Sequence, residues 1–476
     1  MDNQSQNRGQ WGSTFGFLMA AVGSAVGLGN IWGFPYKMGA NGGFAFLLIY
    51  FTLAVVVGFP IMISEMAMGR KIGRSVIVTY RTLDKRFTWV GWLALLSPFL
   101  ILAFYSVLGA YCMEYIWLNF KDLIGLTDLS DFNGGEIFGN MLTDQTGALF
   151  FTLLFLMLCF LIIKGGIKDG IERFNTIGMP ALFIMLAIVI IRAVTLDGAV
   201  EGLKFVFVPN FQPLKENFIG VLSAAGGQMF FSLSLAMGIT ITYGSYLSKQ
   251  ESLVKNGLLV ICSDTLVAVM AGLAVLPAAF ALGGEGANLA GPKLLFVTLQ
   301  DVFAAMGVTG SLFGVMFYLL VFIAAITSAV ALLEVMVTFL VDNAEMKGKT
   351  VNRPLLVGIV CLLVMLEASV VALDGLGSNG LWIPFQSTGL PFSSSWLDFL
   401  DCVSEGIAMP LGALFTAFMV AWVIKPEMIY EEVTQCGHSF KSYPFFKFCI
   451  RFVVPVIMTL VLLGQLDQFF ALGIFN

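Results

Sequence analysis

The residues of this sequence that could do chemistry favour binding over catalysis. The only histidine, His438, lies in a polar stretch, which excludes histidine-based catalytic triads and most zinc sites. The seven cysteines form no Cys-x-x-Cys pair and lie mainly in apolar runs, so we expect free thiols. Asp264 is different, because it is an ionisable residue inside the apolar run I-C-S-D-T-L-V-A-V. Such a position is costly and marks an ion or proton path.

Two Gly- and Ser-rich stretches interrupt other apolar runs. One is G-S-A-V-G-L-G-N from Gly23 to Asn30, and the other is S-L-S-L-A-M-G from Ser232 to Gly238. These residue types weaken a helix and free backbone amides and carbonyls. In hydrocarbon, freed groups must line a cavity or be buried in protein. Close-packing faces of ordinary helices are the alternative for either stretch alone, but the two together favour a binding site.

The elements that position these residues are membrane helices. The 476 residues are 58% hydrophobic and only 12% charged, about half of the ~25% typical of soluble domains, so lipid must cover most of the surface. The net charge of −5, without a basic patch, argues against a nucleic-acid partner. We expect eleven spans of a ~30 Å hydrocarbon core, near residues 13–38, 43–69, 88–118, 148–164, 174–195, 218–247, 254–282, 309–341, 354–373, 399–424 and 448–474.

Charge in the loops predicts the orientation of these spans. The loop 70–86 is strongly basic, whereas residues 120–147 are mainly acidic. By the positive-inside rule, the basic loop and the N-terminus are cytoplasmic, and eleven crossings leave the C-terminus outside. The first run follows a polar lead and lacks an A-x-A exit, so we expect it to remain in the membrane.

The two Gly/Ser stretches lie in spans one and six, which are five spans apart. Equivalent elements would then have opposite orientations, as in inverted repeats with a substrate site between them. The expected fold is an all-α integral membrane protein. Its parts would be a cytoplasmic segment 1–12, a first five-helix repeat 13–195, an extracellular loop 196–217, a second five-helix repeat 218–424, a cytoplasmic loop 425–447 and an eleventh helix 448–476.

A set of strings along most of the chain resembles the neurotransmitter:sodium symporters, and among them the prokaryotic amino-acid transporters with a leucine-transporter-like fold. The strings are Arg8-x-x-Trp11, G-S-A-V-G-L-G-N from Gly23, N-G-G from Asn41, G-F-P-I-M-I-S-E-M-A-M-G-R from Gly58, G-Q-M-F-F-S-L-S from Gly227, I-T-Y-G-S-Y from Ile241, G-P-K-L-L-F-V from Gly291 and A-A-I-T-S from Ala324. Such a set, in order and with suitable spacing, is highly specific.

The resemblance implies two sodium sites built from oxygen ligands, which suit a hard cation. One would use the carbonyls of Gly23, Val26 and Ala324 with the hydroxyls of Thr327 and Ser328. The other would use the Ala25 carbonyl, Asn30, Ser232 and an acceptor on span seven. Aligning span seven with the family by its Gly272 places Asp264 at the acceptor position, whereas aligning it by Pro277 would shift the alignment by one residue. For Thr327 and Ser328, hydrogen bonds to their own helix are the alternative.

Charge considerations extend this resemblance to the transported molecules. In related animal transporters a chloride ion offsets the sodium charge. Here the Asp264 carboxylate would supply that negative charge, so we expect no chloride requirement. Whether a proton returns in exchange stays open. Monoamine-carrying relatives place an aspartate where this chain has Gly27. A glycine leaves room for a substrate carboxylate, which the amides near Leu28 and Gly29 could bind. We therefore expect an amino acid as substrate.

The resemblance also implies the walls of the pocket. With Ala25, Leu28, Gly29 and Ser232, they would be Ser24, Ile101, Tyr105, Phe231, Ser234, Met237, Ser328 and Leu332. None of these residues is charged, so we expect a neutral hydrophobic or aromatic substrate, with flexible Met237 adapting to its shape. Ordinary core packing is the alternative for Phe231, Met237 and Leu332.

Gate residues follow from the same resemblance, with one departure. An Arg8–Asp342 pair with Ser245 and Tyr246 would close the cytoplasmic side. On the outer side Asp401 and Gln228 are present, but Gly33 stands where relatives commonly carry arginine. Lys37, one turn further on, could reach Asp401 instead, or water could solvate Asp401. Glu65 would tie broken helix ends together, whereas Glu114, Glu334, Glu367 and Glu405 have no assigned role.

The resulting interpretation is a multi-pass transporter of a bacterial inner membrane that imports an amino acid with, we expect, two sodium ions. An intramembrane enzyme would need paired carboxylates, a placed histidine or an activated nucleophile. An amino-acid-binding sensor, or a channel without coupled transport, remains the alternative. The oligomeric state stays open.

Overall fold

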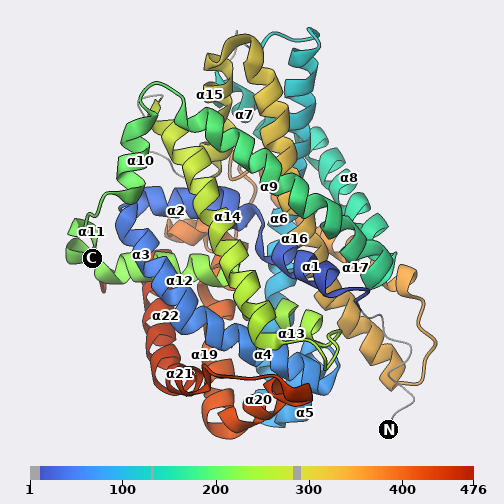
Figure 1. Ribbon diagram of the computed structural model, residues 1–476. Coiled ribbons are helices and arrows are strands. Elements are labelled where there is room, and N and C mark those ends of the chain that lie inside the picture. Colours follow the sequence, from blue (N-terminus) through green and yellow to red (C-terminus); the bar gives the residue numbers. More distant parts are fainter. Residues whose placement is uncertain (1–10, 130–132, 282–290, 476) are drawn as a thin grey trace.

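The computed structural model describes residues 11–129, 133–281 and 291–475, which form helices, turns and loops without a strand (Figure 1). Within this part of the chain, nine unbroken helices are long and apolar enough to cross a membrane, and one bent pair adds a tenth. The sixth expected span consists of two shorter helices. The all-helical membrane fold is confirmed, and the exact number of eleven crossings stays a prediction.

The nine unbroken spans lie within a few residues of their expected positions, several with π-helical turns inside. Five spans are single helices: α6 (Thr88–Leu123), α8 (Gln145–Ile163), α14 (Leu253–Ala281), α16 (Gly310–Met346) and α17 (Arg353–Asp374). The other four contain a π-helical turn: α3 (Phe44–Leu53) with α4 (Phe59–Ile72), α9 (Arg173–Val194) after the turn Ile167–Glu172, α18 (Trp396–Asp401) with α19 (Met409–Phe418) around the turn Cys402–Ala408, and α21 (Tyr443–Phe448) with α22 (Val454–Phe470).

The first and sixth spans are broken where the Gly/Ser stretches occur, as predicted. In the first, α1 (Thr14–Ala25) ends at an extended Val26, and the chain resumes with the π-helical turn Gly29–Gly33 and α2 (Phe34–Ala40) after a bend of 48°. In the sixth, α12 (Phe218–Ser232) and α13 (Ile239–Gly244) are joined by residues with positive φ, namely Ser234, Ala236 and Gly238. A left-handed residue cannot continue a right-handed helix.

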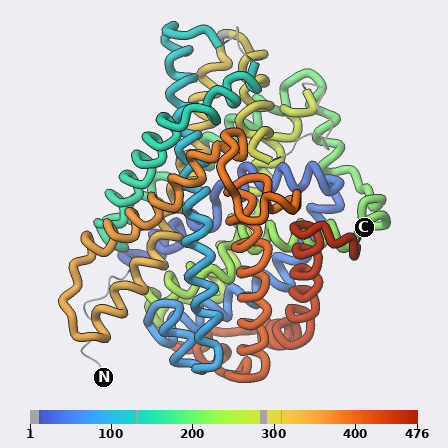
Figure 2. Tube along the Cα trace, turned by 180° about the vertical axis from the view of Figure 1, so that it is seen from behind, coloured from blue at the N-terminus to red at the C-terminus, as the bar shows by residue number. Residues whose placement is uncertain are grey.

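The apolar runs of the sequence did not reveal several short helices. At one end of the bundle are α7 (Gly134–Thr143) and α15 (Leu299–Ala305), at the other are α5 (Val76–Leu83) and α20 (Pro426–Val433), and α10 (Ala199–Phe207) and α11 (Gln212–Glu216) lie along one side (Figure 1). The loops expected at 196–217 and 425–447 are thus partly helical. Seen from behind, the tube shows the long helices of the bundle running between these two ends (Figure 2).

Burial separates central helices from peripheral ones. Every residue from Ala324 to Thr338 in α16 is buried, and α16 packs against α1, α6 and α9. In α17, by contrast, Leu355, Leu362 and Leu366 each expose about 60% of their surface. A helix that is apolar all round is either buried in protein or faces lipid. Helix α16 is therefore central, with α1, α6 and α9 packed on it, while α17 has a lipid-facing side.

Candidate functional site

The two helix breaks meet at a central cavity. The Ser234 hydroxyl in the second break donates to the Ser24 carbonyl in the first at 2.8 Å. The walls of the cavity are Ser24, Ala25, Gly27, Gly29, Ile101, Tyr105, Phe231, Ser234, Met237, Ile239, Ser328 and Leu332. The free volume between them is about 20 Å³, room for about one water molecule. The walls must therefore separate before an amino acid can occupy this space.

The structure brings nearly all the expected pocket residues together. Leu28 and Ser232 do not line the cavity, but the Leu28 amide donates to the Tyr105 hydroxyl at 2.8 Å. Gly27, which does line it, has no space for a side chain, since a Cβ there would lie 2.3 Å from the Tyr105 oxygen and 2.4 Å from that of Ser328. Glycine at this position lets the backbone approach α6 and α16 closely.

The first expected sodium site is partly assembled around Ser328. Its hydroxyl lies 3.2 Å from the Gly23 carbonyl and 3.3 Å from the Val26 carbonyl, so α16 contacts the end of α1 through oxygen atoms. The Thr327 hydroxyl donates to the carbonyls of Ile323 and Ala324 in its own helix, each at 3.0 Å. The alternative of helical back-bonding thus holds for Thr327 in this conformation.

The second expected site gathers around Asp264, which is fully buried. Asn30 Nδ2 donates to Asp264 Oδ1 at 2.7 Å, and the Ser232 hydroxyl lies 2.8 and 3.0 Å from the two carboxylate oxygens. This neighbourhood is the one expected from the register matched at Gly272. A buried carboxylate whose neighbours only donate hydrogen bonds can balance the charge of a cation.

Tyr50, on α3, completes the surroundings of Asp264, and sequence reasoning missed it. Its hydroxyl donates to Asp264 Oδ2 at 3.1 Å. A tyrosine in an apolar span resembles any other packing aromatic, so the sequence carries no signal for this contact. Ala25, whose carbonyl is an expected ligand of this site, lines the central cavity.

Glu65, on α4, binds the second break, as the resemblance implies. It accepts a hydrogen bond from the backbone amide of Ala236 at 3.1 Å and another from the Thr240 hydroxyl. These contacts join residues on both sides of Gly238. The carboxylate thereby satisfies polar groups that the interrupted helix leaves without helical partners.

On the side expected to face outward, a second cavity of about 420 Å³ shares Gly29 and Phe231 with the central one. Lys37 faces this vestibule, and the structure corrects its expected partner: its ammonium forms an ion pair with Glu405 instead of Asp401. Asp401 is close enough to interact with both charges. Gln228 donates to the Gly29 carbonyl at 2.7 Å.

Arg8, expected at the cytoplasmic gate, lies outside the described residues, so its expected pair with Asp342 stays a prediction. Asp342 accepts hydrogen bonds from the Ser75 amide and from Arg74. Burial by itself would lower the pKa of Arg74, but hydrogen bonds and charge from Glu345 and Asp342 raise it above its ordinary value. These contacts join α16 to the bend between α4 and α5.

The other expected cytoplasmic gate residues lie between α13 and α16. The Tyr246 hydroxyl donates to Glu334 at 2.9 Å and lies 2.7 Å from that of Thr338. Ser245 bonds to the Thr242 carbonyl. Glu334, unassigned from the sequence, also pairs with Arg353 at 2.5 Å.

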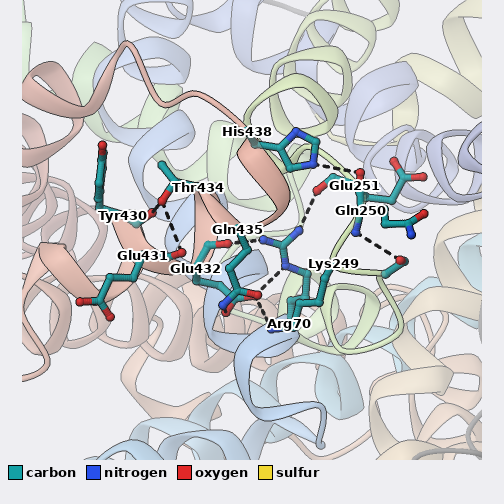
Figure 3. A network of polar contacts seen from close by, with 11 residues as sticks. Arg70, Lys249, Gln250, Glu251, Tyr430, Glu431, Glu432, Thr434, Gln435 and His438 are labelled. Atoms are coloured by element: carbon teal, nitrogen blue, oxygen red, sulfur yellow. Dashed lines mark hydrogen bonds and ion pairs between the residues drawn. The ribbon is translucent and has the colours of Figure 1, made fainter.

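A polar network near α20, on the side expected to be cytoplasmic, was not predicted (Figure 3). The buried Arg70 guanidinium at the end of α4 donates to Glu432 Oε1 in α20 and to the Glu251 carbonyl, each at 2.7 Å. Lys249 also reaches Glu432 at 2.7 Å, and His438 contacts the Gln250 carbonyl at 2.9 Å. The network joins α4, the α13–α14 loop and α20, and the only histidine serves this loop contact.

Comparison with known proteins agrees with this geometry. Residues 8–133 and 132–476 match the model of the sodium:neurotransmitter symporter family. The sodium-dependent transporter YhdH of Bacillus subtilis is 33% identical over 464 residues, covering 96% of this chain and 97% of YhdH. The sodium- and chloride-dependent taurine transporter of Bos taurus is 23% identical, with 96% of this chain and 78% of the relative covered.

Among solved structures, that of MhsT in complex with L-phenylalanine superposes with a TM-score of 0.85 at 34% identity, covering 96% of this chain and all of MhsT. The family match spans almost the whole chain, and the broken first and sixth helices lie where the family resemblance required them. The chain belongs to the sodium:neurotransmitter symporter family and is a sodium-dependent, multi-pass membrane transporter.

Proposed function

We propose that this transporter imports a neutral hydrophobic or aromatic amino acid together with sodium by alternating access. The observation that carries the proposal is the junction of the two breaks, where a cavity without charged walls lies beside the buried Asp264. Backbone amides near Leu28 would bind the substrate carboxylate, and Phe231, Ile101 and Leu332 would contact its side chain. The complex of MhsT with L-phenylalanine supports this substrate class.

Sodium coupling follows from charge balance at the same junction. A substrate carboxylate in a dry site is costly unless a cation lies beside it. One sodium ion near Asn30 and Asp264 would compensate it, and a second near Gly23, Val26 and Ser328 would stabilise the first break. Each ligand then raises the affinity of the other by the same factor, because binding linkage is reciprocal.

The membrane potential and the sodium gradient supply the work. One charge crossing 100 mV gives ~2.3 kcal/mol, and ~1.4 kcal/mol corresponds to a tenfold concentration ratio. Two sodium ions can therefore accumulate a neutral zwitterion strongly. The proposed location is a bacterial inner membrane, with a cytoplasmic N-terminus.

The test is uptake of labelled L-phenylalanine into proteoliposomes with sodium or choline outside. We expect accumulation only with an inward sodium gradient, and competition by large apolar and aromatic amino acids but not by aspartate or lysine. Equal uptake in choline would contradict sodium coupling. Sodium-dependent binding without flux would contradict transport and favour the sensor.

A further inference from the structure

Asn175, on α9, has a buried oxygen that the described hydrogen bonds do not use. The side chain is fully buried, and its Nδ2 donates to the Ile171 carbonyl at 2.8 Å. That bond fixes the orientation of the amide, because only the NH₂ group can donate to a carbonyl. Within the described part of the chain, Asn175 Oδ1 has no hydrogen-bond partner. It is therefore an acceptor with unused capacity in the membrane interior.

This oxygen is directed at the first helix break. A Cβ built on Gly23 would lie 1.9 Å from Asn175 Oδ1, so the oxygen rests directly against the Gly23 backbone. Gly23 is also the residue whose carbonyl lies 3.2 Å from the Ser328 hydroxyl. Asn175 thus approaches the end of α1 from α9, while Ser328 approaches it from α16.

The same turn of α9 also contacts α16 next to the oxygen cluster. A Cβ on Gly178 would lie 3.2 Å from a methyl group of Ile323, and the Ile323 carbonyl accepts from Thr327. Helix α9 therefore covers the junction of α1 and α16 where the first sodium site is expected. Asn175 is the polar residue on this covering turn.

An unpaired buried amide oxygen needs a physical explanation. Leaving such an acceptor unsatisfied costs about 1–3 kcal/mol, and unsatisfied groups in native proteins commonly mark a water or an ion. Amide and backbone carbonyl oxygens are ligands that hard cations accept. A sodium ion between the end of α1 and the middle of α16 would satisfy this oxygen together with the carbonyls of Gly23 and Val26.

We propose that Asn175 Oδ1 is a ligand of the sodium ion at the first break, in addition to the oxygens of α1 and α16, and that it sets the affinity of this site. The inference rests on the proposed sodium-coupled function, which it deepens. It adds α9 to the elements that bind the ion, so that sodium occupancy and the packing of α9 on α1 are linked.

The test is a sodium titration of the thermal stability of the purified protein, with choline keeping the ionic strength constant. An ion that binds the folded state raises Tm as its concentration exceeds Kd. For Asn175→Ala we expect the half-saturating sodium concentration to rise about tenfold, the loss typical of a removed metal-site partner. For Asn175→Asp, which keeps an oxygen and adds charge, we expect a value at or below that of the wild type.

The matched control is Asn119→Ala on α6. Asn119 is equally buried and donates to the carbonyl four residues earlier, at 2.9 Å, but lies away from the breaks, beside Gln300. This variant should lower Tm without changing the sodium response. If Asn175→Ala behaves like the control, Asn175 serves packing alone and the inference is overturned.

Two further outcomes separate the inference from the proposed function. A wild-type protein without any sodium response would overturn both. A normal wild-type response with a higher half-saturating concentration in Asn175→Asp would overturn the ligand role alone, even if Asn175→Ala failed to fold.

Discussion

The carboxylate of Asp264 accepts hydrogen bonds from Asn30, Ser232 and Tyr50 and is fully buried. Hydrogen-bond donors reduce the cost of a buried charge but do not neutralise it, so a cation beside it is favoured. A fixed negative charge at this position would replace a mobile anion. The taurine transporter related to this chain is, by contrast, both sodium- and chloride-dependent.

At this scale we expect uptake by the wild type to be unchanged when gluconate replaces chloride. Asp264→Asn removes the charge and should raise the sodium concentration for half-maximal uptake about tenfold or more, with chloride partly restoring it. Asp374→Asn, another buried acid, should leave the chloride response unchanged. Wild-type uptake that stops in gluconate would contradict this role of Asp264.

Single residues also show what sequence reasoning could reach. The resemblance of ordered motifs to those of a known family predicted that Asn30, Ser232 and Asp264 lie together, which spacing alone could not show because helix breaks and a loop separate these residues along the chain. The contacts of Tyr50 and Asn175 were not predicted, since the sequence does not indicate which residue a tyrosine or asparagine in an apolar span will contact. Lys37 pairs with Glu405, four residues after Asp401 on the same helical face, and sequence spacing alone does not decide between two acids so placed.

Among the elements, the second break depends on Glu65, which accepts hydrogen bonds from Ala236 and Thr240. Glu65→Gln removes the charge and turns one acceptor oxygen into a donor. We expect a loss of about 1–3 kcal/mol of stability and a several-fold lower uptake rate, measured by thermal melting and initial rates. The half-exposed Glu427, paired with Lys447, offers the control, since Glu427→Gln should change stability by less than about 1 kcal/mol. Equal effects of the two substitutions would contradict a special role of Glu65.

The helical elements were predictable to very different degrees. Long apolar runs predicted the positions of the spans because apolar side chains are stable in hydrocarbon. The Gly/Ser stretches predicted both breaks because backbone groups freed there must be satisfied within the protein. The short helices α7, α15 and α20 escaped prediction, since they lie at the ends of the bundle and need not be long or continuously apolar. The charge of the loops predicts the orientation of the spans but not the presence of short helices.

For the whole molecule, the Lys37–Glu405 ion pair connects the first broken span to the span of α18 and α19 across the outer vestibule. It is partly buried, with side-chain exposures of 22% and 9%, so water screens it less than a surface pair. The pair would favour the closed vestibule and slow the escape of bound substrate.

We therefore expect Lys37→Ala to weaken apparent substrate affinity several-fold. The exchanged pair Lys37→Glu with Glu405→Lys should recover part of it, with a coupling energy of about 0.5–3 kcal/mol. Competition binding in sodium buffer measures both, and Lys204→Ala, which removes the exposed Lys204–Glu201 pair, is the control. Unchanged affinity in Lys37→Ala would contradict the role of the ion pair.

Phe231 and Gly29 belong to the walls of both the central cavity and the outer vestibule. One aromatic ring and a short piece of backbone thus lie between the central cavity and the vestibule at this point. An amino acid whose side chain is too long to fit beneath the Phe231 ring would keep the ring from closing over the central cavity. We expect such a compound to block transport instead of being transported.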